Sequence, residues 1–163
     1  MKILTYLLKF NTIFFSLIAL SLLSNQALAN DLSIEHGYIR ATIPGTNVSS
    51  AYMEINNLTE QEAVLVGVST GVSDRVEIHE HVMKGELMRM QKRETLTIGA
   101  HDHVSLQPSG YHLMIFNLTN PLLVDEKVVL TFHFLAHKDV TITIPVQSIK
   151  RKKQQKPAHH HHH

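Results

Sequence analysis

Histidine and methionine alternate in one short part of the sequence. Residues 76–93 read VEIHEHVMKGELMRMQKR, and His112 and Met114 follow later in the chain. Four of the five methionines beyond the initiator lie between His79 and Met114. Methionine often fills protein cores, but its thioether is also a soft, neutral metal ligand, and imidazole suits copper. The pattern predicts a soft-metal site formed by His79, Met90, His112 and Met114.

The kinds of ligand in this set favour Cu(I). Two imidazoles and two thioethers are all neutral, and Cu(II) prefers harder donors and tetragonal geometry. The 163 residues contain no cysteine, which excludes thiolate zinc sites, iron–sulfur clusters and blue-copper centres with a cysteine ligand. We therefore expect one Cu(I) ion per chain.

A β-hairpin is needed to bring the first two ligands together. Lys84-Gly85 stands where a two-residue turn would lie, with glycine supplying a positive φ. Residues that face each other across such a hairpin have Cβ atoms about 4.5–5.5 Å apart. The expected facing pairs are Met83 with Glu86, His81 with Met88, and His79 with Met90.

Three further residues share the expected ligand face of the hairpin, because side chains on a strand alternate with a period of two. His81, Met83 and Met88 are therefore candidates for an access path or an alternative metal site, and simple packing is the other interpretation. His112 and Met114 share a face for the same reason. Convergence of this second pair on the hairpin is a hypothesis that spacing alone does not establish.

The elements expected around these residues are short strands separated by turn signals, which is typical of an antiparallel sandwich or barrel. Turns are indicated at Pro44-Gly45, Lys84-Gly85, Pro108–Gly110 and Asn120-Pro121, among others. The expected strands are Leu32–Ala41, Ser50–Asn56, Ala63–Ser69, Val76–Met83, Glu86–Arg93, Val104–Gln107, His112–Leu118, Val128–Leu135 and Val140–Val146.

The two ends of the chain differ from its middle. Residues 1–29 resemble a secretory signal with a basic start, a short apolar run and an Ala27-Leu28-Ala29 cleavage pattern, although an uncleaved anchor is the alternative. Residues 30–147 form the expected single domain. Residues 148–163 form a basic tail that we expect to be disordered. Its end, His159–His163, is either a purification tag or a native segment that gathers Cu(II).

The charge of the middle region argues against nucleic acid as a partner. Residues 30–149 contain eight basic and 14 acidic side chains, a net charge of −6. Proteins that bind nucleic acid through its phosphates need the opposite balance. The apolar segment at the start is the only run approaching the length of a membrane span, so we expect no membrane insertion once the signal is cleaved.

The four ligand positions resemble the signature of the periplasmic copper chaperones called PCu(A)C. That signature is a His, ten residues, a Met, 21 residues, a His, one residue and a Met, and this sequence meets every spacing. Flanking segments look similar too, and the resemblance covers about residues 32–146. The similar flanking blocks are Tyr38–Thr42 with Pro44-Gly45, Ala51–Met53 with Asn56-Asn57, and Pro108–Met114.

The resemblance implies an all-β, cupredoxin-like antiparallel β-sandwich of Greek-key type. It also implies Cu(I) bound by the four named residues, a periplasmic location, and delivery of copper to the dinuclear copper centre of cytochrome c oxidase, beside Sco-type proteins. Such a protein binds and transfers metal without catalysing a reaction. Copper sequestration or resistance is the alternative function, and a structural β-sandwich with an accidental His/Met pattern also stays open.

Overall fold

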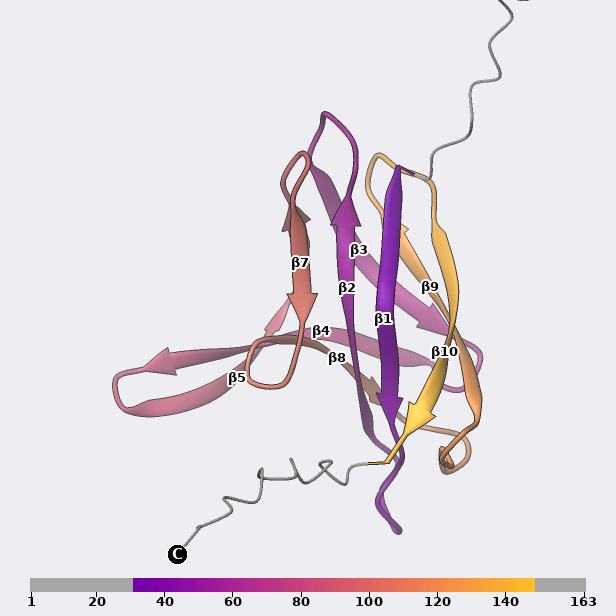
Figure 1. The fold of residues 1–163 in the computed structure, drawn as a ribbon. Helices are drawn as coiled ribbons and strands as arrows, with labels where there is room; N and C mark the ends of the chain where they lie inside the picture. The colour runs from indigo at the N-terminus through magenta and orange to yellow at the C-terminus, as the bar shows by residue number, and fades with distance from the viewer. Residues whose placement is uncertain (1–30, 149–163) are drawn as a thin grey trace, which may run out of the picture. The chain divides into compact units, whose positions relative to one another are not determined.

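The computed structural model describes residues 31–148, which form β-strands joined by turns and loops (Figure 1). This confirms the expected all-β class. Nine of the ten strands lie where the sequence predicts them, and the short strand β6 was not predicted. The strands are β1 Leu32–Arg40, β2 Ser49–Asn57, β3 Ala63–Thr70, β4 Arg75–Lys84, β5 Leu87–Arg93, β6 Leu96–Ile98, β7 His103–Leu106, β8 Tyr111–Phe116, β9 Lys127–Phe134 and β10 Val140–Gln147.

The strands pair in the order β5-β4-β8-β7-β2-β1-β10-β9-β3-β6, and β8 also pairs with β2. Most neighbours are antiparallel, whereas β1 with β10 and β7 with β8 are parallel. The β1–β10 pair connects the half that carries β2, β4, β5, β7 and β8 to the half that carries β3, β6 and β9. In Figure 1, β3 and β9 lie behind β1, β2 and β10, as in the two layers of a sandwich, and β4 and β8 run across the upright strands.

The core fills the space between the layers. Because side chains alternate along a strand, the residues that pack into the core determine which residues lie on the outer face. Leu113 and Ile115 of β8 and Ile78 of β4 are buried in the core cluster with residues such as Phe132 and Leu130. Because neighbours on a strand point to opposite faces, burying Leu113 and Ile115 places His112 and Met114 on the outer face of their sheet. The packing of the core thus positions the second pair of predicted ligands.

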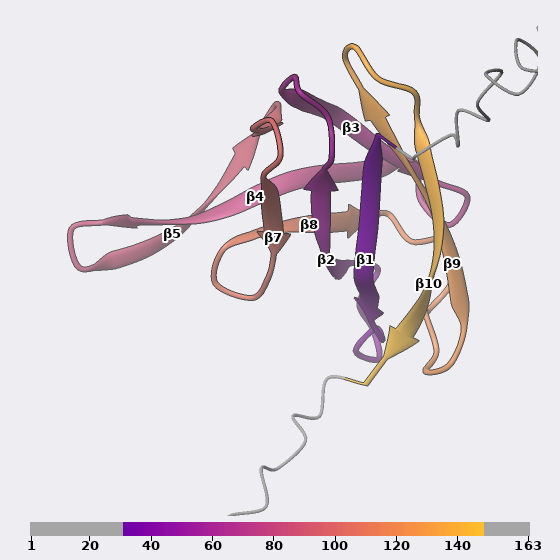
Figure 2. The same cartoon turned by 45° about the horizontal axis from the view of Figure 1, so that its top comes forward.

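The hairpin of β4 and β5 extends away from the sandwich, as both views show (Figures 1 and 2). Its outer strand is exposed from Leu87 to Lys92. Few contacts other than the hairpin's own hydrogen bonds therefore hold β5 in place, and the pairing of the two strands depends on the turn.

The register of this hairpin corrects the sequence prediction. Lys84 pairs with Leu87, so the two-residue loop is Gly85-Glu86, and Gly85 has a φ of +66° at its first position. A glycine with positive φ at that place is typical of a type II′ turn. The loop lies one residue later than predicted, which moves every facing partner by two residues. The observed pairs on the predicted ligand face are Met83 with Met88, His81 with Met90, and His79 with Lys92.

Within residues 31–148, no helix with the length and apolar character of a membrane span is present. The expected signal of residues 1–29 and nearly all of the expected tail, including His159–His163, lie outside the described residues. The domain boundaries therefore stay predictions.

Candidate metal site

Three adjacent strands carry the predicted ligands. In the order β5-β4-β8, His79 of β4 is paired directly with His112 of β8. Met114 lies two residues further along β8, opposite Glu77. Met90 lies opposite His81, which is two residues from His79 along β4 in the other direction. The structure therefore brings the two predicted histidines together and places the methionines on either side of them, not beside each other.

A third imidazole joins this pair. The rings of His81 and His112 are stacked with centroids 4.9 Å apart, and the rings of His79 and His112 are 6.0 Å apart. On its other side His112 faces the Tyr52 ring at 6.3 Å. These neighbours leave His112 only 2% exposed. His112 is therefore a buried imidazole on the outer face of the sheet, covered by other rings.

The hydrogen bond of His112 determines which of its ring nitrogens is free. Nδ1 lies 3.0 Å from the carbonyl oxygen of Gly110, which can only accept, so Nδ1 carries the proton. The lone pair of Nε2 is left for a metal. Burial lowers the pKa of His112 below its ordinary value, against the opposite effect of the Gly110 hydrogen bond. Burial is the larger effect, and it favours the neutral, ligating form, since a lowered pKa means that the proton is lost more readily.

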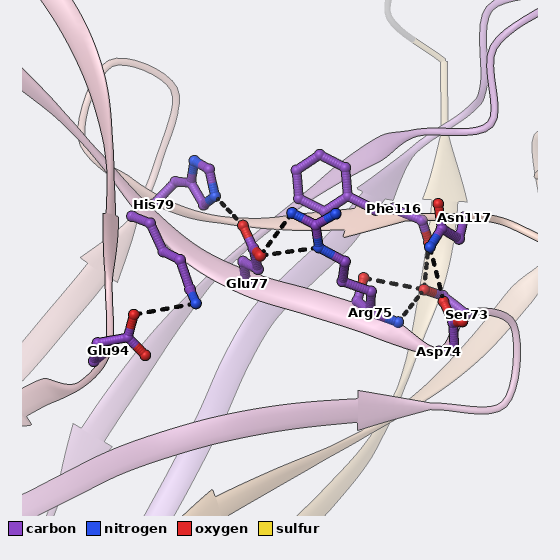
Figure 3. Close-up of polar contacts among 9 residues, drawn as sticks. Ser73, Asp74, Arg75, Glu77, His79, Glu94, Phe116 and Asn117 are labelled. Atoms are coloured by element: carbon purple, nitrogen blue, oxygen red, sulfur yellow. Dashed lines mark hydrogen bonds and ion pairs between the residues drawn. The ribbon is translucent and has the colours of Figure 1, made fainter.

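His79 is oriented by a carboxylate. Its Nε2–H donates to Glu77 Oε2 over 2.8 Å, and Arg75 binds the other carboxylate oxygen over 2.9 Å (Figure 3). The hydrogen bond from His79 lowers the pKa of Glu77, opposed by burial and reinforced by Arg75. With Nε2 protonated, the lone pair of His79 lies on Nδ1. Carboxylate–imidazole pairs of this kind orient metal-binding histidines.

The fit to a metal rests on two buried nitrogen atoms. Nδ1 of His79 and Nδ1 of His81 are buried and have no hydrogen-bond partner within the described residues. Leaving a polar atom buried and unpaired costs about 1–3 kcal/mol. These two unpaired nitrogens, which lie beside the ring of His112, are therefore available as imidazole ligands to a soft metal ion.

Thioethers are needed to complete such a site. Among residues 31–148, no three side chains of His, Asp or Glu are arranged to hold a metal ion by themselves. Met114 is half-buried, and its sulfur accepts a hydrogen bond from Ser50 Oγ at 3.3 Å. Met90 is half exposed. The donor set that the geometry offers therefore combines imidazole nitrogen with thioether sulfur.

Sequence reasoning missed the residues that support these ligands. Glu77, Ser50 and the Gly110 carbonyl each contact a predicted ligand. Glu77 had a local signal, because it precedes His79 by two residues and so shares its face of the strand. Ser50 had none, since its contact with Met114 depends on the pairing of β2 with β8.

Comparison with protein families matches residues 32–146 to the LpqE-like family, whose description is that of a lipoprotein. One curated relative is Lxx21020 of Leifsonia xyli subsp. xyli (strain CTCB07), which is also named as a lipoprotein. It is 24% identical over 120 residues, which cover 73% of this chain and 71% of the relative.

Solved structures of PCuAC domains have the same fold. The copper-bound PCuAC domain from PmoF2 matches with a TM-score of 0.63 and 21% identity, over 72% of this chain and 93% of that domain. The Cu(I) form of DR1885 from Deinococcus radiodurans matches with a TM-score of 0.57 and 26% identity, over 77% and 84%. Its apo form is 27% identical at the same TM-score, over 75% and 82%. The expected cupredoxin-like fold and the resemblance to PCu(A)C proteins are confirmed.

Proposed function

The chain belongs to the LpqE-like family, and we propose that it is a copper-binding protein that receives and transfers Cu(I) without catalysing a reaction. The observation that carries this proposal is the pairing of His79 with His112, in which each ring is held by a hydrogen bond on one nitrogen and keeps the lone pair of the other for a metal. The second nitrogen of His79, Nδ1, is buried without a hydrogen-bond partner among the described residues. Met90 and Met114 supply thioethers from either side.

Cu(I) suits this donor set better than the other metals available to exported proteins. All four ligands are neutral, two of them are soft, and no ligand has to lose a thiol proton when the ion binds. The likeness to the Cu(I) form of DR1885 and to the copper-bound PmoF2 domain supports copper as the cargo. We propose one Cu(I) ion at these four residues in each chain.

Transfer fits the position of the ligands at the surface. Met90 is half exposed and lies on a strand that extends from the sandwich, so the ligands of a partner protein can replace its thioether first. We propose that the recipient is a cuproenzyme, with the copper-centre subunit of cytochrome c oxidase or a Sco-type protein as the first candidates. Sequestration of copper is the alternative function, and failure to transfer to any acceptor would favour it.

The place of action that we propose is the periplasm. The signal-like features of residues 1–29 and the lipoprotein names of the family and of the relative both support export.

The proposal is tested by anaerobic titration of Cu(I) against a chromophoric chelator, with X-ray absorption on the loaded protein. We expect one tightly bound ion with nitrogen and sulfur scatterers, and at least about tenfold weaker affinity after Met90→Leu and Met114→Leu together, because leucine keeps the volume and removes the ligand. Met53→Leu is the matched control, since Met53 is buried in the core. Unchanged affinity in the double variant, or a spectrum without sulfur, contradicts the site.

A further inference from the structure

The tip of the β4–β5 hairpin carries methionines that packing does not explain. Met83 is 64% exposed and Met88 is 57% exposed. Methionine is normally used to fill the core, and an exposed cluster of large apolar side chains usually indicates a binding surface. These two residues therefore need a reason other than the stability of the fold.

The register of the hairpin places the two methionines opposite each other, where both could bind one ion. Met83 and Met88 are directly opposed across the hairpin, and the next pair on the same face is His81 with Met90. Directly opposed Cβ atoms lie about 4.5–5.5 Å apart, and each thioether stands on a flexible chain with three rotatable bonds. Two sulfur atoms can thus reach one ion held above the strands.

The third donor is available in the adjacent pair. Nδ1 of His81 is buried without a hydrogen-bond partner in the described part of the chain. His81 also stacks on His112 at 4.9 Å. It therefore lies between the methionine pair at the tip and the histidine pair at the base of the hairpin.

The charges of the hairpin agree with a site for a soft cation bound by neutral ligands. Lys84 and Arg89 pair with Leu87 and Val82, which places both on the opposite face. The first cationic side chain on the methionine face is Lys92, opposite His79, and it forms an ion pair with Glu94 at 3.1 Å. No cationic side chain therefore lies between the tip and the His81–Met90 pair on this face.

We propose that Met83, Met88 and His81 form a second, outer Cu(I) site, from which the ion passes to the inner site at His79, Met90, His112 and Met114. This inference rests on the proposed function. The passage is ligand exchange: each incoming nitrogen or sulfur replaces one that leaves, the ion stays Cu(I), and no electron or proton is transferred. The outer site is exposed and is the weaker of the two.

The experiment follows the methionine methyl signals by NMR in the full chain labelled with ¹³C-methyl methionine, with Ag(I) as a redox-inert probe of Cu(I) sites. We expect the first equivalent to shift Met90 and Met114 and the second to shift Met83 and Met88. Met53, buried in the core, is the internal reference and stays in place.

Two variants distinguish metal binding by the thioethers from a contribution of the apolar surface alone. Met83→Leu with Met88→Leu keeps the apolar surface, and we expect it to abolish the second step, to leave the affinity of the first within twofold, and to slow Cu(I) release to a chelator at least fivefold. Leu87→Ala is the matched control, because Leu87 is 62% exposed at the same tip and has no metal-binding atom.

Three results would overturn the outer site. They are Met83 and Met88 signals that do not move with two equivalents, signals that move together with Met90 and Met114 in one step, and equal defects in Leu87→Ala and in the double methionine variant. In each of these the response of Met90 and Met114 leaves the inner site standing. If Met90 and Met114 do not respond either, the proposed function itself fails.

Discussion

At the scale of single residues, the candidate site depends on which nitrogen of each imidazole carries the proton. Glu77 determines this for His79, and the Gly110 carbonyl determines it for His112. A carboxylate holds the imidazole proton more strongly than a neutral acceptor does. The affinity for copper should therefore depend on a residue that never contacts the ion.

Glu77→Gln tests this dependence. The amide oxygen can still accept from His79 Nε2–H, but without the charge, so we expect Cu(I) affinity to fall by about tenfold, the lower end of the usual range for such supporting residues. Affinity is measured by chelator competition, and the His79 tautomer by ¹⁵N NMR. Glu80→Gln is the control, because Glu80 is also on β4 but binds Arg93 on the other face. Equal losses in both variants would contradict a specific role for Glu77.

The burial of His112 has a consequence for pH. Burial lowers its pKa below the ordinary value of 6.5, so below about pH 6.5 the unfolded chain takes up a proton that the folded chain refuses. The unfolded state then binds more protons, and the free energy of unfolding of the metal-free protein should fall as the pH falls from 6.5. Imidazole titration by NMR, with urea unfolding at pH 7.5 and 5.5, measures both effects. A His112 that titrates at or above 6.5 would contradict the prediction.

At the scale of the elements, the sequence predicted which residues share a face better than which residues touch. The period of two placed His79, His81, Met83, Met88 and Met90 on one side of the hairpin, and a loop position wrong by one residue left that result unchanged. The facing partners were wrong because they depend on whether Lys84 or Gly85 begins the loop. Lys-Gly is a weak turn signal, and only the pairing of whole strands decides between the two.

Strands β6 and β8 each have a property that the local sequence pattern does not predict. Strand β6 has three residues, too few for any periodicity to be recognised, and its pairing with β3 is what makes it a strand. The outer position of His112 was predictable from its alternation with Leu113. Its almost complete burial was not, because His81 and Tyr52 cover it from other strands.

The turn of the hairpin is itself testable. Gly85 has a φ of +66°, so Gly85→Ala should cost about 1–2 kcal/mol locally and loosen the pairing that brings His81 to Met90. We expect faster amide exchange along β5 with little change in the core strands, measured by hydrogen–deuterium exchange. Gly71→Ala is the control, because Gly71 has open space for a Cβ and no positive φ. Equal exchange in both variants would show that the turn does not control the register.

At the scale of the whole molecule, alternating residues of one strand serve two purposes, because some pack into the core and the others carry the predicted ligands. Leu113 and Ile115 have no exposed surface and pack in the core, while His112 and Met114 alternate with them and point to the ligand side. The predicted ligands come from β4, β5 and β8, three strands that lie together only in the folded chain. Metal binding should therefore be coupled to the stability of the entire sandwich.

This coupling should make copper binding stabilise the folded chain. A ligand that binds only the folded state stabilises it by RT ln(1 + [L]/Kd), which is about 2.7 kcal/mol at a free concentration 100 times Kd. We expect free Cu(I), buffered anaerobically at that level, to raise the free energy of urea unfolding by about this amount, and by much less in the Met90→Leu, Met114→Leu double variant at the same free Cu(I). Met53→Leu should keep the full increase, since it removes no ligand. An increase of the same size in the double variant would mean that copper stabilises the fold from another place, and no increase in the parent protein would mean that the ligands do not converge on one ion.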